Sequence, residues 1–318
     1  MKEELGDDFL FSGMSANDQT MSVFDQKQTT MDGIYRPKLD DAKDKKIGYR
    51  ATMRFLPNLM KNGKIGPSAI EKHVHYVDFK NSPDIAGYYD CRKNYEPTCE
   101  LCAEYWKLKN SKNQADVEKA ALINRTTKYY SYVMIIEDDQ HQELVGKILL
   151  FPYGYTIKEK INAERTGEVS GDPNNIFDIA KGKDFKLIIK EKGGFQNYDA
   201  SQFMESSPIK LFDEKTSTFK MAPVDADGKI TNPKAQAKIK EVLMNREVDI
   251  DDHKPVQWDE EMKVRVAKVI NILYGNDVFV AEQKTNQAKT GNVEKPVDSE
   301  SSGGAVDADD FFSLDSDD

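Results

Sequence analysis

The stretch CRKNYEPTCELC (Cys91–Cys102) contains all three cysteines of this 318-residue chain. Cys99 and Cys102 have the C-x2-C spacing that lets two thiolates bind one face of a tetrahedral ion, and seven residues separate Cys91 from Cys99. An odd number of thiols cannot be closed by internal disulfides alone. Zinc prefers four ligands, and three cysteines with one histidine are a standard structural set. The stretch therefore predicts one structural zinc ion with a fourth ligand elsewhere in the chain.

The fourth ligand is expected from SAIEKHVHYVDF (Ser68–Phe79), which contains His73 and His75. Residues two apart lie on the same face of a strand, so periodicity does not choose between the two histidines. His75 is closer in sequence to the cysteines. We therefore predict the ligands His75, Cys91, Cys99 and Cys102, with His73 as the alternative. A closed four-ligand site has no position for a reacting water, which indicates a structural ion. A redox pair at C-x2-C is the competing interpretation, but the pair does not follow a recognisable strand within a βαβ unit.

Around the cysteine stretch, the residue pattern predicts a mixed, mainly β fold with inserted helices. Runs rich in β-branched and aromatic residues indicate strands; they are 46–57, 68–79, 125–136, 145–151 and 184–192. Helical spacing of apolar residues indicates helices over 101–110, 114–123, 156–165, 233–246 and 259–275. Gly193-Gly194 is typical of a hairpin turn. Short strands with helices inserted between them favour a small β-barrel core.

The acidic residues are concentrated at the two ends of the chain. The formal net charge is −10, but residues 1–35 contain seven acidic and two basic residues, and residues 291–318 contain nine and one. We predict a flexible acidic arm over 1–45, a folded core over 46–280 with a zinc subdomain at about 67–122, and a disordered acidic tail over 281–318. No stretch approaches the roughly 20 apolar residues that a membrane span needs.

Basic and aromatic residues alternate in NRTTKYYSY (Asn124–Tyr132). Single-stranded nucleic acid binds grooves that combine cations for phosphates with flat side chains for bases. Taken one at a time, these rings are more often core residues of strands. As a set they favour binding, and the DNA-binding residues predicted from this pattern are Arg54, Arg125, Lys128, Tyr129, Tyr130, Phe151, Tyr153, Phe195 and Tyr198.

The ordered motifs MRFLP, the His/Cys3 cluster, NRTTKYYSYVMII, KINAE, FKLIIKEKGGFQNYDASQF and an acidic tail resemble the single-stranded DNA-binding proteins of T-even-like bacteriophages. The resemblance covers about residues 45–210 and the tail. It implies an OB-fold core with a zinc-binding insertion and helical connecting elements. It further implies phosphate contacts for Arg54 and Arg125, base stacking or cleft lining for Tyr129, Tyr130, Phe151, Phe195 and Tyr198, and a weaker role for Tyr95. Known members begin with a basic segment that binds a neighbouring protomer, whereas this chain begins with an acidic arm.

The resemblance also implies a biological role. The chain would coat and protect single-stranded DNA, without sequence preference, in phage DNA replication, recombination and repair in the host cell cytoplasm, in a filament of identical protomers. The acidic tail would compete with DNA for the basic cleft. Once displaced, its tip, formed by Asp309, Asp310, Phe311, Phe312 and Leu314, would bind partner proteins such as phage polymerase, primase-helicase and recombination mediator.

Two other functions are weighed against this one. A zinc-containing transcription factor that binds duplex DNA would use the same Lys, Arg and aromatic side chains to contact a groove of the DNA. An enzyme is not indicated, since the sequence has no Gly-rich phosphate loop, H-E-x-x-H motif or nucleophile elbow. Asp251-Asp252-His253 lies in a polar connection between two predicted helices, where a surface role is the simpler interpretation.

Overall fold

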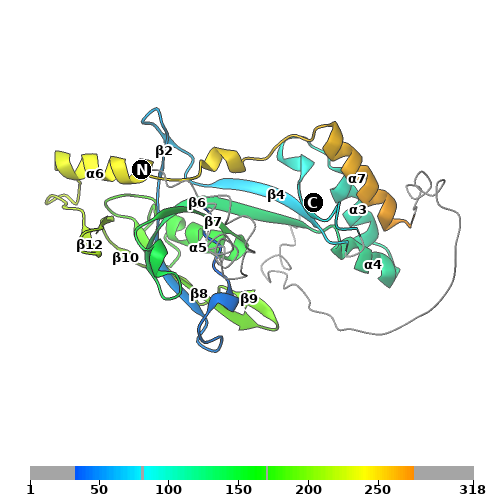
Figure 1. Ribbon diagram of the computed structural model, residues 1–318, viewed down its shortest axis with the longest axis horizontal. Coiled ribbons are helices and arrows are strands. Elements are labelled where there is room, and N and C mark those ends of the chain that lie inside the picture. The colour runs from blue at the N-terminus through cyan, green and yellow to red at the C-terminus, as the bar shows by residue number, and fades with distance from the viewer. Residues whose placement is uncertain (1–32, 80–81, 170, 276–318) are drawn as a thin grey trace, which may run out of the picture.

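One antiparallel sheet organises the fold (Figure 1). The computed structural model describes residues 33–79, 82–169 and 171–275. Within them the sheet has eight strands in the order β10-β8-β1-β6-β4-β5, with β7 paired to β6 and β9 paired to β8. The strands are β1 (Tyr49–Phe55), β4 (Ile70–Val77), β5 (Gly87–Asp90), β6 (Arg125–Asp138), β7 (Ile148–Tyr153), β8 (Lys183–Lys192), β9 (Phe195–Asn197) and β10 (Gln202–Ser206). The predicted mainly β class is confirmed.

The remaining elements surround this sheet. Two small hairpins are formed by β2 (Asn58–Leu59) with β3 (Ile65–Gly66), and by β11 (Lys210–Asp213) with β12 (Thr218–Met221). The α-helices among the described residues are α3 (Glu100–Lys109), α4 (Gln114–Ala121), α5 (Tyr155–Thr166), α6 (Pro233–Met244) and α7 (Glu260–Leu273). Single 3-10 turns are η1 (Leu39–Asp41), η2 (Arg92–Asn94), η3 (Gln142–Leu144) and η4 (Ile250–His253). No helix of residues 33–275 that the structure describes combines the length and apolar character needed to cross a bilayer.

Strand β6 connects the two ends of the molecule. It has 14 residues, and its first half pairs with β4 while its second half pairs with β1 along the same edge. β7 pairs along its other edge. In Figure 1, β4 and β6 run together from the centre of the molecule to the group formed by α3, α4 and α7. The helical group is therefore attached to the sheet through a two-stranded extension.

Side chains on the two faces of β6 pack into two separate hydrophobic cores. Val133 and Ile135 point into the sheet core, which also contains Phe55, Phe151 and Phe185. The intervening side chains, Tyr132 and Met134, point to the opposite face and pack in the α6 core with Ile239 and Leu243. Successive side chains on a strand point to opposite faces, so one run of apolar residues fills both cores. A third cluster, the cysteine core, contains the three cysteines together with Leu101, Ile123 and residues of α7.

The segment before β1 is held by a buried carboxylate. Asp138 is fully buried, and its Oδ2 accepts hydrogen bonds of 2.6 Å from the hydroxyls of both Tyr35 and Tyr49. Burial and the neighbouring carboxylate raise the pKa of Tyr49 far above its ordinary value, which keeps the hydroxyl protonated as a donor. Leu39 and Ala42 also belong to the sheet core. The folded part of the chain therefore begins before the predicted boundary at residue 45, while residues 1–32 of the predicted arm lie outside the described residues.

The sequence pattern identified most elements correctly. The five predicted strand regions correspond to β1, β4, β6, β7 and β8, and the five predicted helices correspond to α3 to α7. Gly193 and Gly194 have φ of 65° and 86°, and Lys192 pairs with Phe195 across them. This confirms the predicted hairpin turn, because two successive positive φ values suit a two-residue connection that only glycine adopts easily.

Candidate metal centre and nucleic-acid interface

Four side chains from separate elements converge in the cysteine core. His75 comes from β4, Cys91 follows β5, Cys99 precedes the first residue of α3, and Cys102 lies in the first turn of α3. One potential ligand atom from each lies within 4.8 Å of the other three, and all four residues are buried. A single metal ion could therefore be held by four side chains at once.

The distances match those of a tetrahedral site. The Sγ atoms of Cys91 and Cys102 are 3.5 Å apart, and Nε2 of His75 lies 3.5 Å from Sγ of Cys99 and 3.4 Å from Sγ of Cys102. Bonds of about 2.0–2.3 Å to a central ion at tetrahedral angles would place such atoms roughly 3.5–3.8 Å apart. Hydrogen bonds from Cys102 and then Cys91 lower the pKa of Cys99 well below its ordinary value. A thiolate is the form of cysteine that binds metals.

The hydrogen-bond partners of the Nδ1 atoms show which of the two histidines can bind a metal ion with the cysteines. Nδ1 of His75 lies 2.9 Å from the carbonyl oxygen of Ile123, to which it can donate. That bond leaves Nε2 unprotonated and directed at the thiols, an arrangement usual for histidines that bind metals. Nδ1 of His73 instead lies 2.9 Å from Oγ1 of Thr127, and the His73 side chain is 25% exposed. The structure brings His75, and not His73, to the cysteines.

The NRTTKYYSY stretch forms the first part of β6, and alternation divides its basic and aromatic residues between two faces. Arg125 and Tyr129 lie on one face, and Lys128 and Tyr130 lie on the other. We call the first of these the Tyr129 face. Its cross-strand pairs are His75 with Arg125 and Tyr129 with Tyr153. The predicted DNA-binding set is therefore not one continuous surface.

The face that contains Tyr130 is crossed by the chain between α6 and α7. Tyr130 stacks on the ring of His253 with a centroid separation of 5.2 Å. Further along, the backbone N–H of Val256 donates to Oδ2 of Asp90 at 2.7 Å, and Figure 1 shows this connection running beside β4. An approaching polynucleotide would meet this segment before the strands.

Burial separates supporting rings from accessible rings on the Tyr129 face. Phe151 is 2% exposed and Tyr153 is 5% exposed, so both of these predicted DNA contacts lie within the sheet core. Tyr129 is half-buried and stacks on Tyr153 at 5.7 Å with 23° between the planes. The buried ring of Tyr153 thus packs against the ring of Tyr129 and restricts its orientation.

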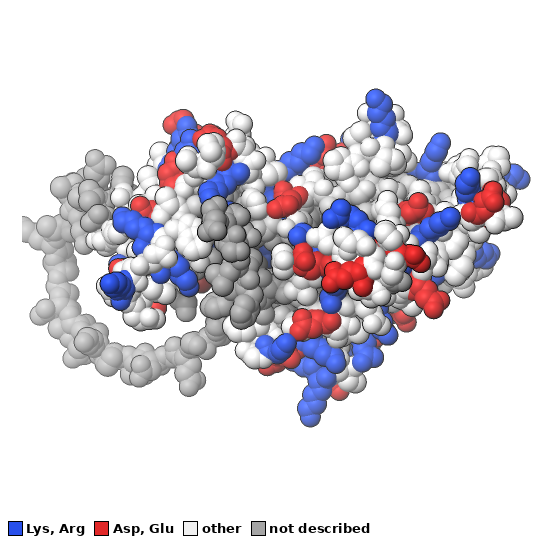
Figure 2. Space-filling model, turned by 180° about the vertical axis from the view of Figure 1, so that it is seen from behind, with Lys and Arg blue, Asp and Glu red and all other residues white. Residues whose placement is uncertain are grey.

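The β8–β9 hairpin contributes the other predicted rings. Phe195 is 39% exposed, and Tyr198 is half-buried against the sheet core. Next to Tyr198, Asp199 accepts a bond of 3.0 Å from Lys192 at its carboxylate and another of 3.0 Å from Lys160 at its carbonyl. Figure 2 shows Lys and Arg side chains at the lower end of the molecule, where both the dark-blue turn before β1 and the β8–β9 hairpin lie in Figure 1. Rings and lysines therefore occur together at this edge of the sheet.

Tyr95 connects the loop between Cys91 and Cys99 to the segment before α7, and its predicted DNA contact stays a prediction. Its hydroxyl accepts a hydrogen bond of 2.8 Å from the backbone N–H of Trp258, and its ring packs against the cysteine core. We call the elements that hold the four potential ligands, from β4 through α3, the metal module. The sequence pattern did not assign any part of 211–280 to this module. Trp258, Val266, Val269 and Leu273 all belong to the cysteine core. Their helical spacing was visible in the sequence, but nothing in it indicated which core they would join.

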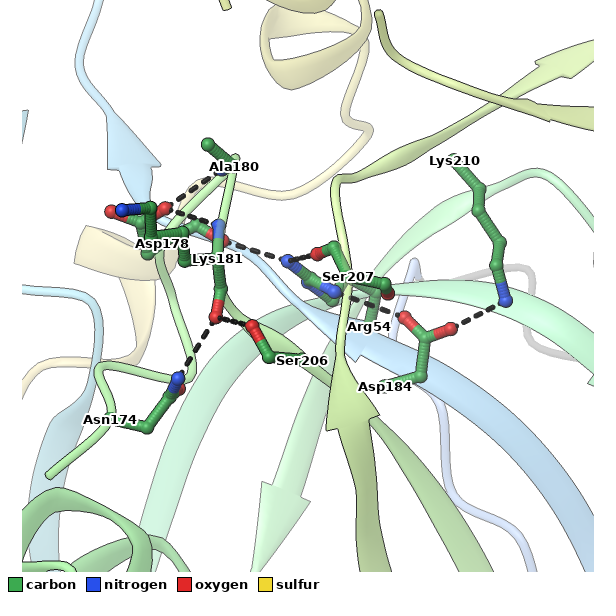
Figure 3. A network of polar contacts seen from close by, with 9 residues as sticks. All are labelled: Arg54, Asn174, Asp178, Ala180, Lys181, Asp184, Ser206, Ser207 and Lys210. Atoms are coloured by element: carbon green, nitrogen blue, oxygen red, sulfur yellow. Dashed lines mark hydrogen bonds and ion pairs between the residues drawn. The ribbon is translucent and has the colours of Figure 1, made fainter. Parts of the chain in front are cut away.

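Arg54 is a structural residue (Figure 3). Its side chain is 1% exposed and forms an ion pair of 3.2 Å with Asp184. It also donates to the carbonyl oxygens of Asp178 at 2.8 Å and Ser207 at 3.0 Å. Lys210 binds the other oxygen of Asp184 at 2.7 Å. A phosphate would reach Arg54 only if this network opened, so the predicted phosphate contact is not supported by the structure. The predicted tail residues, Asp309, Asp310, Phe311, Phe312 and Leu314, lie outside the described residues.

Residues 48–253 match the family described as gp32 DNA binding protein like. The chain belongs to this family. It is also similar to the single-stranded DNA-binding proteins of Enterobacteria phage T2 and Enterobacteria phage T4, each 29% identical over 193 residues. The aligned part is 58% of this chain and spans 58% of the length of each relative.

The Arg54 network gives a prediction about stability. Replacing Arg54 with Ala leaves Asp184 buried beside a single remaining cation, and we expect the free energy of unfolding to fall by about 3–5 kcal/mol. Arg50 is exposed on the same strand, and its replacement with Ala is expected to change stability by less than about 0.5 kcal/mol. Urea unfolding followed by circular dichroism measures both values. Equal stability of the two variants would contradict the structural role of Arg54.

Proposed function

We propose that the chain binds single-stranded DNA without regard to sequence, along the Tyr129 face. The observation that carries the proposal is the position of Tyr129, a half-buried ring stacked on Tyr153, on the same face of β6 as Arg125. Such a ring can stack on any base, and a nearby guanidinium can bind the phosphate that joins two bases. Membership of a DNA-binding family and the names of the two phage relatives support the same function.

We infer that the sheet core is an OB-fold. Its antiparallel strands surround one aromatic-rich core, and α5 lies in sequence between β7 and β8. Small, partly open barrels of this kind bind oligonucleotides across the face of their central strands. The Tyr129 face occupies such a position, between the β8–β9 hairpin and the metal module. Phe195 and Tyr198 would extend the row of stacking rings along the hairpin.

We assign zinc to the cysteine core. Three thiolates and one imidazole are a soft, tetrahedral donor set that selects zinc over the hard cations calcium and magnesium. The ion would hold His75, which is the cross-strand partner of Arg125. It would therefore act on DNA binding indirectly, by keeping the first residue of β6 in register with β4.

Replacing His75 with Ala tests the metal assignment. We expect native mass spectrometry of the full chain to show one zinc ion, and the His75→Ala variant to lose it because one of four ligands is missing. His73 lies two residues away on the same strand but outside the cluster, so His73→Ala should keep the ion. Retention of zinc by the His75 variant, or its loss from the His73 variant, would refute the proposed ligand set.

Replacing Arg125 and Lys128 one at a time tests the binding face. Affinity for poly-dT is measured by fluorescence quenching over a range of salt concentrations. Arg125→Ala should reduce the slope of log affinity against log salt by about 0.7, as expected for one lost phosphate contact. Lys128→Ala is the matched control, since it removes the same charge three residues along β6 on the opposite face, and it should leave the slope unchanged.

Tyr129→Ala should weaken binding by about 1–3 kcal/mol for one lost stacked base. If the two charge variants behave alike, DNA does not select the Tyr129 face. If duplex DNA binds as tightly as poly-dT, the chain is better described as a duplex-binding factor.

We further propose that the acidic tail competes with DNA for this face and then recruits phage replication and recombination proteins. The hydroxyl of Tyr274 donates to Glu104 on α3, so the chain leaves α7 beside the metal module. Residues 291–318 contain nine acids and one base. Attachment at this point would give them a high effective concentration at the Tyr129 face.

Deleting residues 291–318 should tighten binding to poly-dT at low salt, and the difference should narrow as salt screens the charges. Replacing the nine acids of this segment with Asn and Gln retains its length and should have the same effect as the deletion. Unchanged affinity for both variants throughout the salt series would exclude competition by the tail.

A further inference from the structure

Helix α7 packs on the metal module although about 160 residues of chain separate it from the ligands. Val266, Val269 and Leu273 are at most 2% exposed and share a core with Cys91, Cys99 and Cys102. Val264, on the opposite side of the helix, is 54% exposed. The apolar side of α7 therefore covers the elements that hold the metal ligands.

The connection into α7 is anchored on residues next to a ligand. Nε1 of Trp258 donates to the carbonyl oxygen of Asp90 at 2.7 Å, and Asp90 directly precedes Cys91. The Asp90 carboxylate accepts from the backbone N–H of Val256 at 2.7 Å and forms an ion pair of 2.8 Å with Lys72. The Arg92 guanidinium lies 5.9 Å from the centre of the Trp258 ring. Both neighbours of Cys91 in sequence are thus in contact with this segment.

The same segment contacts the loop between Cys91 and Cys99. The backbone N–H of Trp258 donates to the hydroxyl of Tyr95, which lies midway between these cysteines. Arg265 of α7 lies 5.2 Å from the ring of Tyr89 and donates to the carbonyl oxygen of Asp84, before the first cysteine. The match to the DNA-binding family ends at residue 253. The segment that contacts the metal module lies beyond the matched region.

We propose that Trp258 and the buried side chains of α7 position the ligands of the metal site. They hold the backbone on both sides of Cys91 and cover the start of α3, so retention of the ion and docking of residues 256–273 form one cooperative unit. Residues outside the ligand set commonly orient the ligands in this way, and their loss typically costs about 10–100-fold in metal affinity. The inference rests on the proposed zinc site and deepens it.

Two valines of α7 provide a matched test. Val269 is fully buried in the cysteine core and Val264 is exposed, so the same Val→Ala change can be made on both sides of one helix. Zinc release from the full chain to an excess of a chromogenic chelator is followed by absorbance. V269A is expected to release zinc about 10-fold faster than the unmodified chain, while V264A should match it. Equal release rates for the three proteins would overturn the proposal.

A second measurement uses tryptophan fluorescence and leaves α7 itself unchanged. The chain has two, Trp106 and Trp258, which are 43% and 9% exposed. In a W106F variant the fluorescence reports Trp258 alone. Chelation of zinc should shift its emission to the red and remove the hydrogen-exchange protection of 260–273, while protection of β1 and β8 persists. If α7 keeps its protection after the ion is removed, docking and metal retention are independent and the proposal fails.

A failure of this proposal can be distinguished from a failure of the proposed zinc site. If native mass spectrometry finds no ion in the unmodified chain, the metal site itself is refuted before α7 is considered. If the ion is present and the V269A chain unfolds completely, the fluorescence and exchange measurements on W106F still decide the question, because that variant changes only an exposed ring.

Discussion

The arrangement of this protein depends on the continuity of β6 through 14 residues. A strand rises about 3.4 Å per residue, so β6 extends roughly 45 Å. At its start Arg125 is paired with a proposed metal ligand, and at its end Asp138 is buried beneath two tyrosine hydroxyls. Backbone pairing to β4, β7 and β1 along this length keeps the metal module and the sheet core in one register. The Tyr129 face can therefore present a ring and a cation at a defined spacing.

Two charged groups on neighbouring strands illustrate how burial decides the role of a residue. Arg54 and Arg125 are both basic residues of β-strands that flank aromatic side chains. Arg54 is enclosed by Asp184 and two backbone carbonyls, and burial lowers its pKa while Asp184 opposes this change. A buried charge must be paired in this way, because its desolvation would otherwise destabilise the fold. Arg125 retains partial exposure at the start of β6, which a phosphate contact requires.

The metal module also shows how distant segments can share one core. Its ligands come from three elements within about thirty residues, a short range that limits the apolar area available to enclose them. The segment that follows α6 crosses the Tyr130 face, contacts Asp90 through Val256 and Trp258, and continues into α7. The same segment thus covers the Tyr130 face of the β4–β6 extension. One chain path therefore covers the Tyr130 face and encloses the cysteine core.

The sequence by itself determined the long strands and the helices, and the residue types of the potential metal ligands. Strand alternation, helix periodicity and the spacing of the cysteines are local properties, and the structure contains the elements that they predict. Strand periodicity could not separate His73 from His75, since both lie on one face of β4. Proximity in sequence favoured His75, and the structure adds the physical reason, a carbonyl at Ile123 that holds its ring. The sequence also could not show that Arg54, Phe151 and Tyr153 are enclosed, or that α7 would join the cysteine core. Those outcomes depend on which surfaces meet after the chain has folded, because burial and partner choice are set by contacts between residues far apart in sequence.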